Sequence, residues 1–408
     1  MPVAEPIVFN PLDPGFRADP YALYARMRAE DPVHQAPVGR WVLSRYADCV
    51  AILRDPRASS DLTNSAAYQQ AIEKRGGIAP DAPLLKMRPF LILDPPDHTR
   101  LRGLVSKAFT PKVVEGLRPR IQELVDELLD AVAEQGSMEV IEDFAYPLPV
   151  TVICELLGVP PEDHGTFKEW SRHLARGQDP PEVLSPEVVK RSVDAMTLFM
   201  DYFGGLIKEH RKRPRSDLLS ALIEAEDAGD KLTEDELLST CVFLLAAGHE
   251  TTVNLIGNGT LALLRHPDQL SKLRDDPSLA GSAVEELLRY DAPVQFAMRT
   301  AREEIELAGL TIPKGAQIIL LLGAANRDPE QFPHPDRLDI TRADNHHIAF
   351  GFGIHFCLGA PLARVEGEIA FRTLVRRFRG LELQTERPEY NENIVLRGLA
   401  SLPVGLAA

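Results

Sequence analysis

Cysteine is scarce in this chain of 408 residues, and its four copies form no pairs. They lie far apart and no C-x-x-C sequence occurs; their positions are Cys49, Cys154, Cys241 and Cys357. This spacing argues against a zinc knuckle and against a disulfide framework. We therefore expect free thiols, which fit a reducing compartment.

The chain also lacks a long apolar run, a basic leader and an excess of positive charge. Its longest apolar runs, CVFLLAAG and IILLLGAA, are far shorter than the roughly 20 residues that span a bilayer. Prolines and an acidic residue stand where a signal peptide needs an apolar segment, in MPVAEPIVFNPLDPGFRADP. The net charge of −15 argues against nucleic acid as a partner, because phosphate binding needs an exposed basic surface. We expect a cytoplasmic protein that binds neither nucleic acid nor membranes.

Hydrophobic periodicity predicts a protein that is mainly helical, with small β-sheets. Residues 20–56 indicate a helix, a short strand pair around Trp41 to Ser44, and a second helix. The stretch from Ala58 to Pro89 mixes Asn, Gly and Pro with isolated apolar residues, which predicts a long mobile loop. Helical spacing then runs from Leu101 to about Glu134 and from about Pro147 to His210.

The clearest helix runs from Thr233 to Arg265. It begins with a capping box, T-E-D-E, and ends before His266 and Pro267. Its length of roughly 50 Å crosses a whole domain. Short strands follow, then a glycine-rich loop at 350–359 and a last helix from about Pro361 to Phe378. Because no linker divides the chain, we expect one domain over 1–408, with β-rich parts at about 1–60 and 295–340.

One loop, from Phe350 to Gly359, places three glycines around a cysteine directly before a helix. Glycine permits a positive φ and lets the backbone approach a bulky ligand. The start of a helix favours an anionic sulfur, so Cys357 is predicted to act as a thiolate. The other three cysteines are predicted to be small buried hydrophobic residues.

The loop matches the pattern F-x-x-G-x-H-x-C-x-G in full, and the sequence thereby resembles the cytochrome P-450 family. The resemblance implies a triangular prism of helices with a long central helix that crosses over a bound haem b. It also implies that Cys357 is the axial ligand of the haem iron, and that Phe350, Gly351 and Gly359 belong to the haem-binding loop.

A second motif, Ala247-Gly-His-Glu-Thr-Thr252, lies inside the long helix. The resemblance makes Glu250 the acid and Thr251 the alcohol that pass protons to dioxygen, and Thr252 could replace Thr251. It places Ala247 and Gly248 against the haem. A zincin motif, H-E-x-x-H, is one residue short here, because Val253 stands where the second histidine is required.

Further motifs imply how the haem is held. Glu286 and Arg289 form an E-x-x-R sequence, and at positions i and i+3 they share one helix face. By resemblance this pair has a structural role beneath the haem, and Arg337 joins its network. The two propionates need cationic donors, and the family's positions for these are His98, Arg102, Arg299 and His355.

The resemblance implies a monooxygenase that inserts one atom of O2 into a lipophilic small molecule such as a macrolide, terpenoid, steroid or fatty acid. The predicted pocket residues are Leu85, Val294, Phe296 and Ala297. A non-catalytic haem protein of the same fold would be expected to lose Cys357 or the Glu250–Thr251 pair, and both are present. We also expect a monomer.

No flavin or dinucleotide motif follows the haem region, so a separate ferredoxin and reductase are expected to supply electrons. By resemblance, two clusters of basic residues border the thiolate side of the haem, where a basic surface would attract an acidic donor. They comprise Arg100, Arg102, Lys107 and Lys112, and Arg364, Arg372, Arg376, Arg377 and Arg379.

Overall fold

The computed structural model describes residues 7–36, 40–74, 88–180, 183–227 and 232–407. Its N-terminal part follows the predicted order of helix, strand pair and helix. The elements are α1 (Pro14–Ala18), α2 (Tyr21–Glu30), β1 (Val33–Ala36), β2 (Arg40–Leu43), α3 (Tyr46–Arg54) and β3 (Ala58–Ser59).

The prediction of a continuous loop from Ala58 to Pro89 is wrong in its first half. A 3-10 turn, η2 (Leu62–Asn64), and the helix α4 (Ala66–Lys74) form there. The sequence AAYQQAIEK is rich in strong helix formers, and this local propensity outweighs the scattered Asn and Gly residues around it. Residues 75–87 lie outside the described part of the chain, and the turn η3 (Phe90–Ile92) follows them.

Helices dominate the middle of the chain, as the periodicity predicted, and a short strand, β4 (Ser137–Glu139), interrupts them. They are α6 (Asp97–Ala108), α7 (Pro111–Gly116), α8 (Arg118–Val132), the π-helical turn η4 (Val140–Ala145), α9 (Pro147–Leu156), the 3-10 turn η5 (Pro161–Thr166), α10 (Phe167–Arg176), α11 (Pro186–Lys212) and α12 (Leu218–Asp227).

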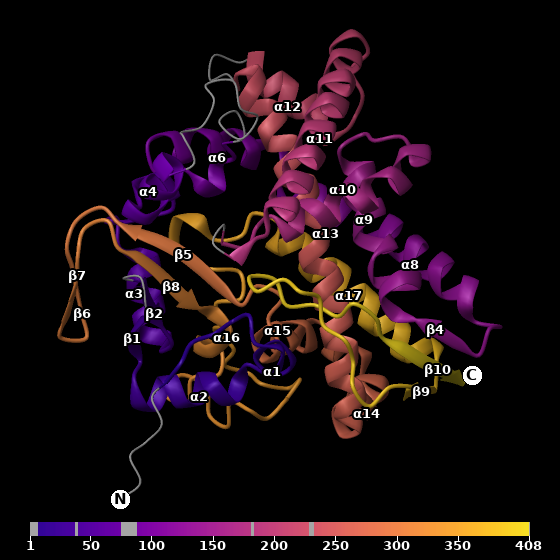
Figure 1. Cartoon of the computed structure of the whole chain (residues 1–408). Coiled ribbons are helices and arrows are strands. Elements are labelled where there is room, and N and C mark those ends of the chain that lie inside the picture. The colour runs from indigo at the N-terminus through magenta and orange to yellow at the C-terminus, as the bar shows by residue number, and fades with distance from the viewer. Residues whose placement is uncertain (1–6, 37–39, 75–87, 181–182, 228–231, 408) are drawn as a thin grey trace, which may run out of the picture.

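The long helix α13 (Glu234–Arg265) runs through the middle of the molecule, with other helices on several sides (Figure 1). The predicted capping box is confirmed: Glu236 N–H donates to Thr233 Oγ1 at 3.2 Å, and Thr233 N–H donates to Glu236 Oε2 at 2.8 Å. A Cβ at Gly259 would stand 2.4 Å from the Phe371 ring. The absence of a side chain there lets the last long helix pack directly on α13.

The remaining elements follow α13, and the predicted last helix is confirmed within one residue at each end. They are α14 (Pro267–Asp275), η7 (Pro277–Leu279), α15 (Ala280–Tyr290), β5 (Phe296–Ala301), β6 (Ile305–Leu307), β7 (Leu310–Ile312), β8 (Gln317–Leu321), α16 (Leu322–Ala325), η8 (Gly353–His355), α17 (Ala360–Arg377), β9 (Gly380–Leu383) and β10 (Pro403–Ala407).

A five-stranded sheet in the order β1-β2-β8-β5-β3 joins the N-terminal region to residues 296–321. Its centre is the parallel pairing of β2 with β8, in which Trp41 lies opposite Ile318. A second sheet, β4-β10-β9, holds the C-terminus. The predicted fold class, mainly α with small β-sheets, is confirmed, whereas the single domain over 1–408 stays a prediction.

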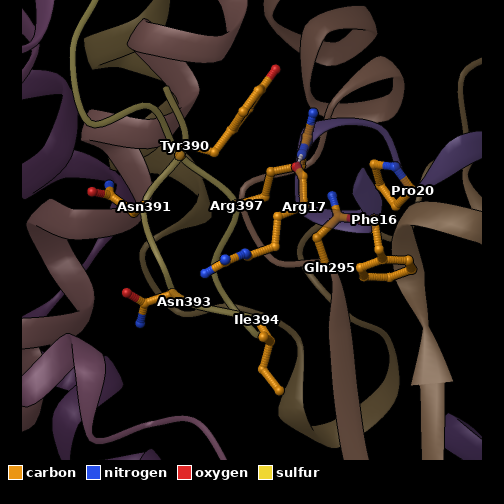
Figure 2. A pocket seen from close by; sticks show the side chains of 10 residues that line it. Phe16, Arg17, Pro20, Gln295, Tyr390, Asn391, Asn393, Ile394 and Arg397 are labelled. Atoms are coloured by element: carbon orange, nitrogen blue, oxygen red, sulfur yellow. Dashed lines mark hydrogen bonds between the residues drawn. The ribbon is translucent and has the colours of Figure 1, made fainter. Parts of the chain in front are cut away.

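Figure 2 shows where the N-terminal segment meets the loop at 390–398. Arg397 is nearly buried, and its Nε donates to Asp291 Oδ1 at 2.8 Å while its Nη2 donates to Ala18 O at 3.1 Å. The guanidinium also lies 4.0 Å from the centre of the Tyr390 ring. These contacts fix the loop beside the start of β5, where Gln295 N–H donates to Val395 O.

None of the helices in the described ranges is both long enough and apolar enough to cross a membrane.

Candidate active site

Two glycines in left-handed conformation shape the loop that carries Cys357. Gly351 and Gly353 both have φ +72°, a value that other residues rarely adopt. A Cβ at Gly353 would stand 2.7 Å from the carbonyl oxygen of Leu53, so this glycine also permits close contact with α3. The loop then closes on itself, because Cys357 N–H donates to Phe350 O at 2.9 Å.

Cys357 differs from the other cysteines because it is exposed, whereas the thiols of Cys49, Cys154 and Cys241 lie in residues that are fully buried. Their burial raises the pKa of each thiol. They behave as the small hydrophobic residues that the sequence predicted.

The thiol of Cys357 is subject to opposing electrostatic influences. Although Cys357 has exposed surface, many protein atoms surround its sulfur, and the resulting desolvation is the largest effect and raises the pKa. The N–H groups of Gly359 and Ala360, at the start of α17, lower the pKa, as do the charges of Arg102 and Arg364. The helix start therefore acts in the predicted direction but does not ionise the thiol by itself. A metal ion bound to the sulfur would supply the missing positive charge.

Two histidines and two arginines meet near this loop, although they come from three separate parts of the sequence. The rings of His98, on α6, and His355, on η8, have centroids 4.2 Å apart. Arg102 lies one helical turn after His98 and donates from Nη2 to Phe356 O at 2.5 Å. Arg299, on β5, is near enough for its charge to lower the pKa of His355.

The charge of Asp94 acts on His98 and Arg299, but several polar atoms of these four side chains still lack a hydrogen-bond partner among the described residues. Both ring nitrogens of His98 and Nδ1 of His355 are buried without a partner among the described residues. Burial lowers the pKa of His355 to about 3, and lowers that of Arg299 to about 10. Buried polar groups are normally hydrogen-bonded, so the cluster fits a ligand that carries carboxylate groups.

On α13, Thr251 bonds to Ala247 one turn earlier, whereas Gly248 meets a different element. Thr251 Oγ1 donates to Ala247 O at 3.0 Å, one turn back along the helix. Gly248 faces a different element: a Cβ there would stand 3.0 Å from Ile153 of α9. Successive helical residues are about 100° apart, so Gly248 meets α9, and its place against the haem stays a prediction.

Glu250 is a largely buried acid on the same helix, with a side chain 19% exposed. Desolvation raises its pKa to about 7, and the nearby charge of Arg172, on α10, opposes this rise. A carboxyl group with this pKa can either hold or release a proton near neutral pH.

Thr252 points to another buried acid, Glu366 of α17, which the sequence reasoning missed. Burial raises the pKa of Glu366 to about 8, and the neighbouring Thr252 hydroxyl lowers it. Neither carboxyl oxygen has a hydrogen-bond partner within the described residues. Its helical position between Val365 and Ile369, both buried, was the sequence signal that could have revealed it.

Glu286 and Arg289 are completely buried and form a bidentate pair. Arg289 Nε donates to Glu286 Oε2 at 2.8 Å, and Arg289 Nη2 donates to Glu286 Oε1 at 2.8 Å. Arg289 also donates to Asn326 O and Pro335 O, and Glu286 accepts from Asp339 N–H at 2.9 Å. The pair thus fastens a long loop to α15.

Arg337 does not join this network through its charge, contrary to the prediction. Its side chain is exposed, and only its carbonyl oxygen accepts from Arg289. Arg342 supplies the second guanidinium instead, with Nε 3.0 Å from Glu286 Oε2. The neighbouring Glu285 accepts from Arg364 Nε at 2.6 Å, which ties α15 to the helix after Cys357. Spacing in the sequence does not reveal which of several nearby arginines binds Glu286.

The predicted pocket residues Phe296 and Ala297 lie next to each other on β5, and their side chains therefore point to opposite faces of the sheet. Phe296 is 2% exposed and packs in a core cluster with Tyr24 and Ile319, so it does not line an open pocket. Ala297 has the opposite orientation and shares it with Arg299. Val294 is half-buried beside the loop at 390–398, and Leu85 lies outside the described residues.

The described residues contain no group of three or more His, Cys, Asp or Glu side chains that could hold a metal ion by themselves. His249 is buried and bonds to Leu245 O. A zinc site at H-E-T-T-V therefore has no support within these ranges.

The family model for cytochrome P450 matches residues 85–404 of this chain. The chain belongs to the cytochrome P450 family. The polyketide biosynthesis cytochrome P450 PksS of Bacillus subtilis is 41% identical over 99% of this chain and 100% of its own. The vitamin D(3) 25-hydroxylase of Pseudonocardia autotrophica is 44% identical over 95% of this chain and 94% of its own.

Solved cytochrome P450 structures share the whole fold. That of PksS has a TM-score of 0.89 at 41% identity and covers 98% of this chain and 100% of its own. P450BioI, solved in complex with an acyl carrier protein that carries hexadec-9-enoic acid, has a TM-score of 0.88 at 41% identity, and covers 97% of this chain and 99% of its own.

This cytochrome P450 is a monooxygenase whose cofactor is haem b with thiolate-ligated iron. The cluster of unpaired histidines and desolvated arginines fits the carboxylates of that cofactor. Cys357 is an exposed, free cysteine, so its thiolate is suited to bind the iron of the haem.

The matched variants Glu286→Gln and Glu285→Gln test whether the buried pair holds the P450 fold together. Loss of the Glu286 charge leaves Arg289 buried and unpaired, which should lower the free energy of unfolding by about 3–5 kcal/mol. Glu285 is partly exposed, so water can replace part of its bonds to Arg364 and His347, and its loss should cost less, about 1–2 kcal/mol. Denaturant unfolding and the haem content of purified protein measure the difference. Equal effects in the two variants would contradict it.

Proposed function

We propose that this cytochrome P450 hydroxylates or epoxidises a lipophilic small molecule, and that a separate ferredoxin and reductase supply its electrons. The observation that carries the proposal is the placement of Glu250 and Thr251 on the long helix of a chain whose exposed cysteine lies in the matching loop. An acid and an alcohol at these positions favour a protein that activates oxygen over one that only binds haem.

Each residue of the site has a proposed task. Cys357 would hold the haem iron, and His98, Arg102, Arg299 and His355 would bind the propionates. When bound, thiolate-ligated haem supplies the activation of dioxygen for insertion into a C–H or double bond, with the second oxygen atom leaving as water. The roles of Phe350, Gly351 and Gly359 follow from their place in the cysteine loop.

Proton transfer would belong to Glu250 and Thr251. The bond from Thr251 Oγ1 to Ala247 O holds the threonine rotamer, so the lone pairs of the oxygen stay available to accept a hydrogen bond. Glu250, with its pKa raised to about 7 by burial, can renew the proton near neutral pH. Thr252 is 2% exposed and lies against Glu366, so its hydroxyl is a weaker candidate.

Thr251→Ala and Thr252→Ala distinguish the two hydroxyls. Without the Thr251 hydroxyl, the ratio of product formed to reduced nicotinamide consumed should fall about tenfold or more, because the proton arrives at the wrong time or place. Haem content should stay unchanged. Thr252→Ala should retain coupling within about twofold under the same conditions. If Thr252→Ala uncouples the reaction and Thr251→Ala does not, the role belongs to Thr252.

The substrate is proposed to be lipophilic because the residues assigned to the pocket are mainly apolar, with Ala247, Val294 and Ala297 among them. Relatives point to the same chemistry: one is named for polyketide biosynthesis and another for hydroxylation of vitamin D(3). The structure of P450BioI with an acylated carrier protein adds the possibility of a tethered substrate.

Titration of the haem absorption separates these substrate classes. We expect a low-spin to high-spin change with at least one of a macrolide, a steroid and a long-chain fatty acid, and no change with sugars or amino acids. The same acyl chain should be offered free and on an acyl carrier protein. Tighter binding of the tethered form would assign a carrier-bound substrate, and a response to polar ligands alone would overturn the lipophilic assignment.

The electron donor is proposed to bind the surface around the cysteine loop. Several predicted cations are already neutralised, since Arg364 pairs with Glu285 and Arg377 pairs with Asp130. Within the described ranges, ion pairs are absent from four others: Lys107, Lys112, Arg376 and Arg379. Ile354 and Phe356 add exposed apolar surface beside Cys357.

Charge reversal tests this surface. The double variant with Lys107→Glu and Lys112→Glu should slow electron transfer from an acidic ferredoxin about tenfold at low salt, because electrostatic steering is lost. The difference should shrink as salt rises. The double variant with Lys208→Glu and Lys212→Glu, on α11, makes the same charge change elsewhere and should leave the rate unaltered. An equal loss in both variants would place the docking surface elsewhere.

A further inference from the structure

His249 is a buried histidine with only one of its ring nitrogens satisfied. It is 1% exposed, and its Nδ1 lies 2.7 Å from Leu245 O. Because a carbonyl oxygen only accepts, Nδ1 carries the hydrogen and Nε2 presents a lone pair. Burial lowers the pKa of His249 to about 4, so the ring is neutral at physiological pH. Nε2 is thus a buried acceptor with no donor among the described residues.

A second unsatisfied group lies beside it. The Tyr146 ring meets the His249 ring edge to face, with centroids 6.0 Å apart and an angle of 86°. The hydroxyl of Tyr146 is buried and lacks a partner in the described structure. Burial raises the pKa of Tyr146, and the nearby charge of Glu250 raises it further. The tyrosine is therefore a neutral donor close to the same carboxyl group.

The carboxyl group of Glu250 lies near both of these groups. Its Oε2 is 3.9 Å from His249 Nε2, about 1 Å beyond hydrogen-bond length. A protonated carboxyl group could donate from its O–H to His249 and accept from Tyr146 with its second oxygen. A carboxylate could accept from Tyr146 but could offer nothing to His249.

Another histidine of this chain shows that the required distance can be reached. His210 is also 1% exposed, and its Nδ1 lies 3.0 Å from Leu206 O, one turn back along α11. Its Nε2, however, lies 2.9 Å from Asp217 Oδ2. A buried helical histidine with a satisfied Nδ1 therefore can place Nε2 at hydrogen-bond distance from a carboxyl group in this fold, although an ionised Asp217 would accept from Nε2–H instead of donating to it.

We propose that His249 is a positioning residue for Glu250, whose protonated carboxyl group it holds by accepting a hydrogen bond at Nε2. This bond requires a rotation of the Glu250 side chain that closes the gap of 3.9 Å. The bond exists only while Glu250 carries its proton, so His249 stabilises the form that can deliver a proton. The inference rests on the proposed role of Glu250 as the acid.

The other charges around Glu250 act in known directions. From α10, Arg172 favours the carboxylate and lowers the pKa of Glu250. Lys168, also on α10, is paired with Glu142 of η4, and Arg172 lies 3.8 Å from the same Glu142. On α9, Cys154 stays neutral because burial raises its pKa. His249 is thus the neighbour that favours the protonated form through a specific bond.

The direction in which His249→Phe changes the pKa of Glu250 distinguishes this proposal from a role of His249 in packing alone. Loss of the acceptor in His249→Phe destabilises only protonated Glu250, so the pKa of Glu250 should fall by roughly one unit. A phenyl ring is less polar than an imidazole, and through desolvation alone it would raise that pKa. A histidine that merely fills space therefore predicts a rise or no change.

Infrared titration of the haem-loaded protein provides the measurement. The C=O band of protonated Glu250 is identified by its loss in Glu250→Gln, and its intensity is followed against pH. The midpoint should lie near pH 7 in the unaltered protein, since burial raises the pKa of Glu250 to about 7. It should move roughly one unit lower in His249→Phe. The pH at which product formation becomes uncoupled should fall with it.

Three variants complete the test. His249→Gln keeps an acceptor oxygen and should restore most of the midpoint. Tyr146→Phe removes a bond available to both forms of Glu250 and should move the midpoint less than His249→Phe does. His210→Phe removes the comparable histidine from α11 and should leave the Glu250 band unchanged. If His249→Phe does not fold, His249→Leu and His249→Gln make the same comparison.

An unchanged or raised midpoint in folded His249→Phe overturns the proposal. The infrared result does not depend on turnover. If Glu250→Gln keeps full coupling, Glu250 is not the acid and the proposed proton transfer fails. The bond to His249 would then still be decided by the band itself, so the two failures are distinguishable.

Discussion

The buried ion pair of Glu286 and Arg289 is the interaction on which the geometry of the site depends. Both side chains are completely excluded from solvent, and an isolated charge in such a place would be strongly unfavourable. Each therefore recruits further partners from the segment at 326–345, which has little regular structure of its own. That segment leads directly into the loop of Cys357, so the position of the sulfur follows from charges that lie outside the site.

The long helix α13 carries polar side chains through the interior of the protein. On one face Thr251 bonds to a carbonyl of its own helix, and on others Glu250 and Thr252 meet separate surroundings. Desolvation raises the pKa of Glu250 to about 7 and that of Glu366 to about 8. Buried acids with such values favour proton transfer at neutral pH, whereas exposed ones would be ionised.

Much of the fold could be predicted because its signals are local. The capping box at Thr233 and the glycines at 351 and 353 depend on a few neighbouring residues, and the structure has them as expected. The helix α4 was missed because strong helix formers there are surrounded by Asn and Gly residues. The errors at Arg337 and Phe296 have another origin, since they concern the direction of side chains toward distant elements.

The sequence by itself determined the family, the cysteine loop and the motif of acid and alcohol, because each is a short run of residues whose types and spacing carry the chemistry. Only the tertiary structure decided which charges meet. It brought His98 to His355, chose Arg342 over Arg337, and buried Nε2 of His249 without a hydrogen-bond partner among the described residues. The physical reason is that desolvation and pairing depend on what packs around a group, and chain spacing does not encode that.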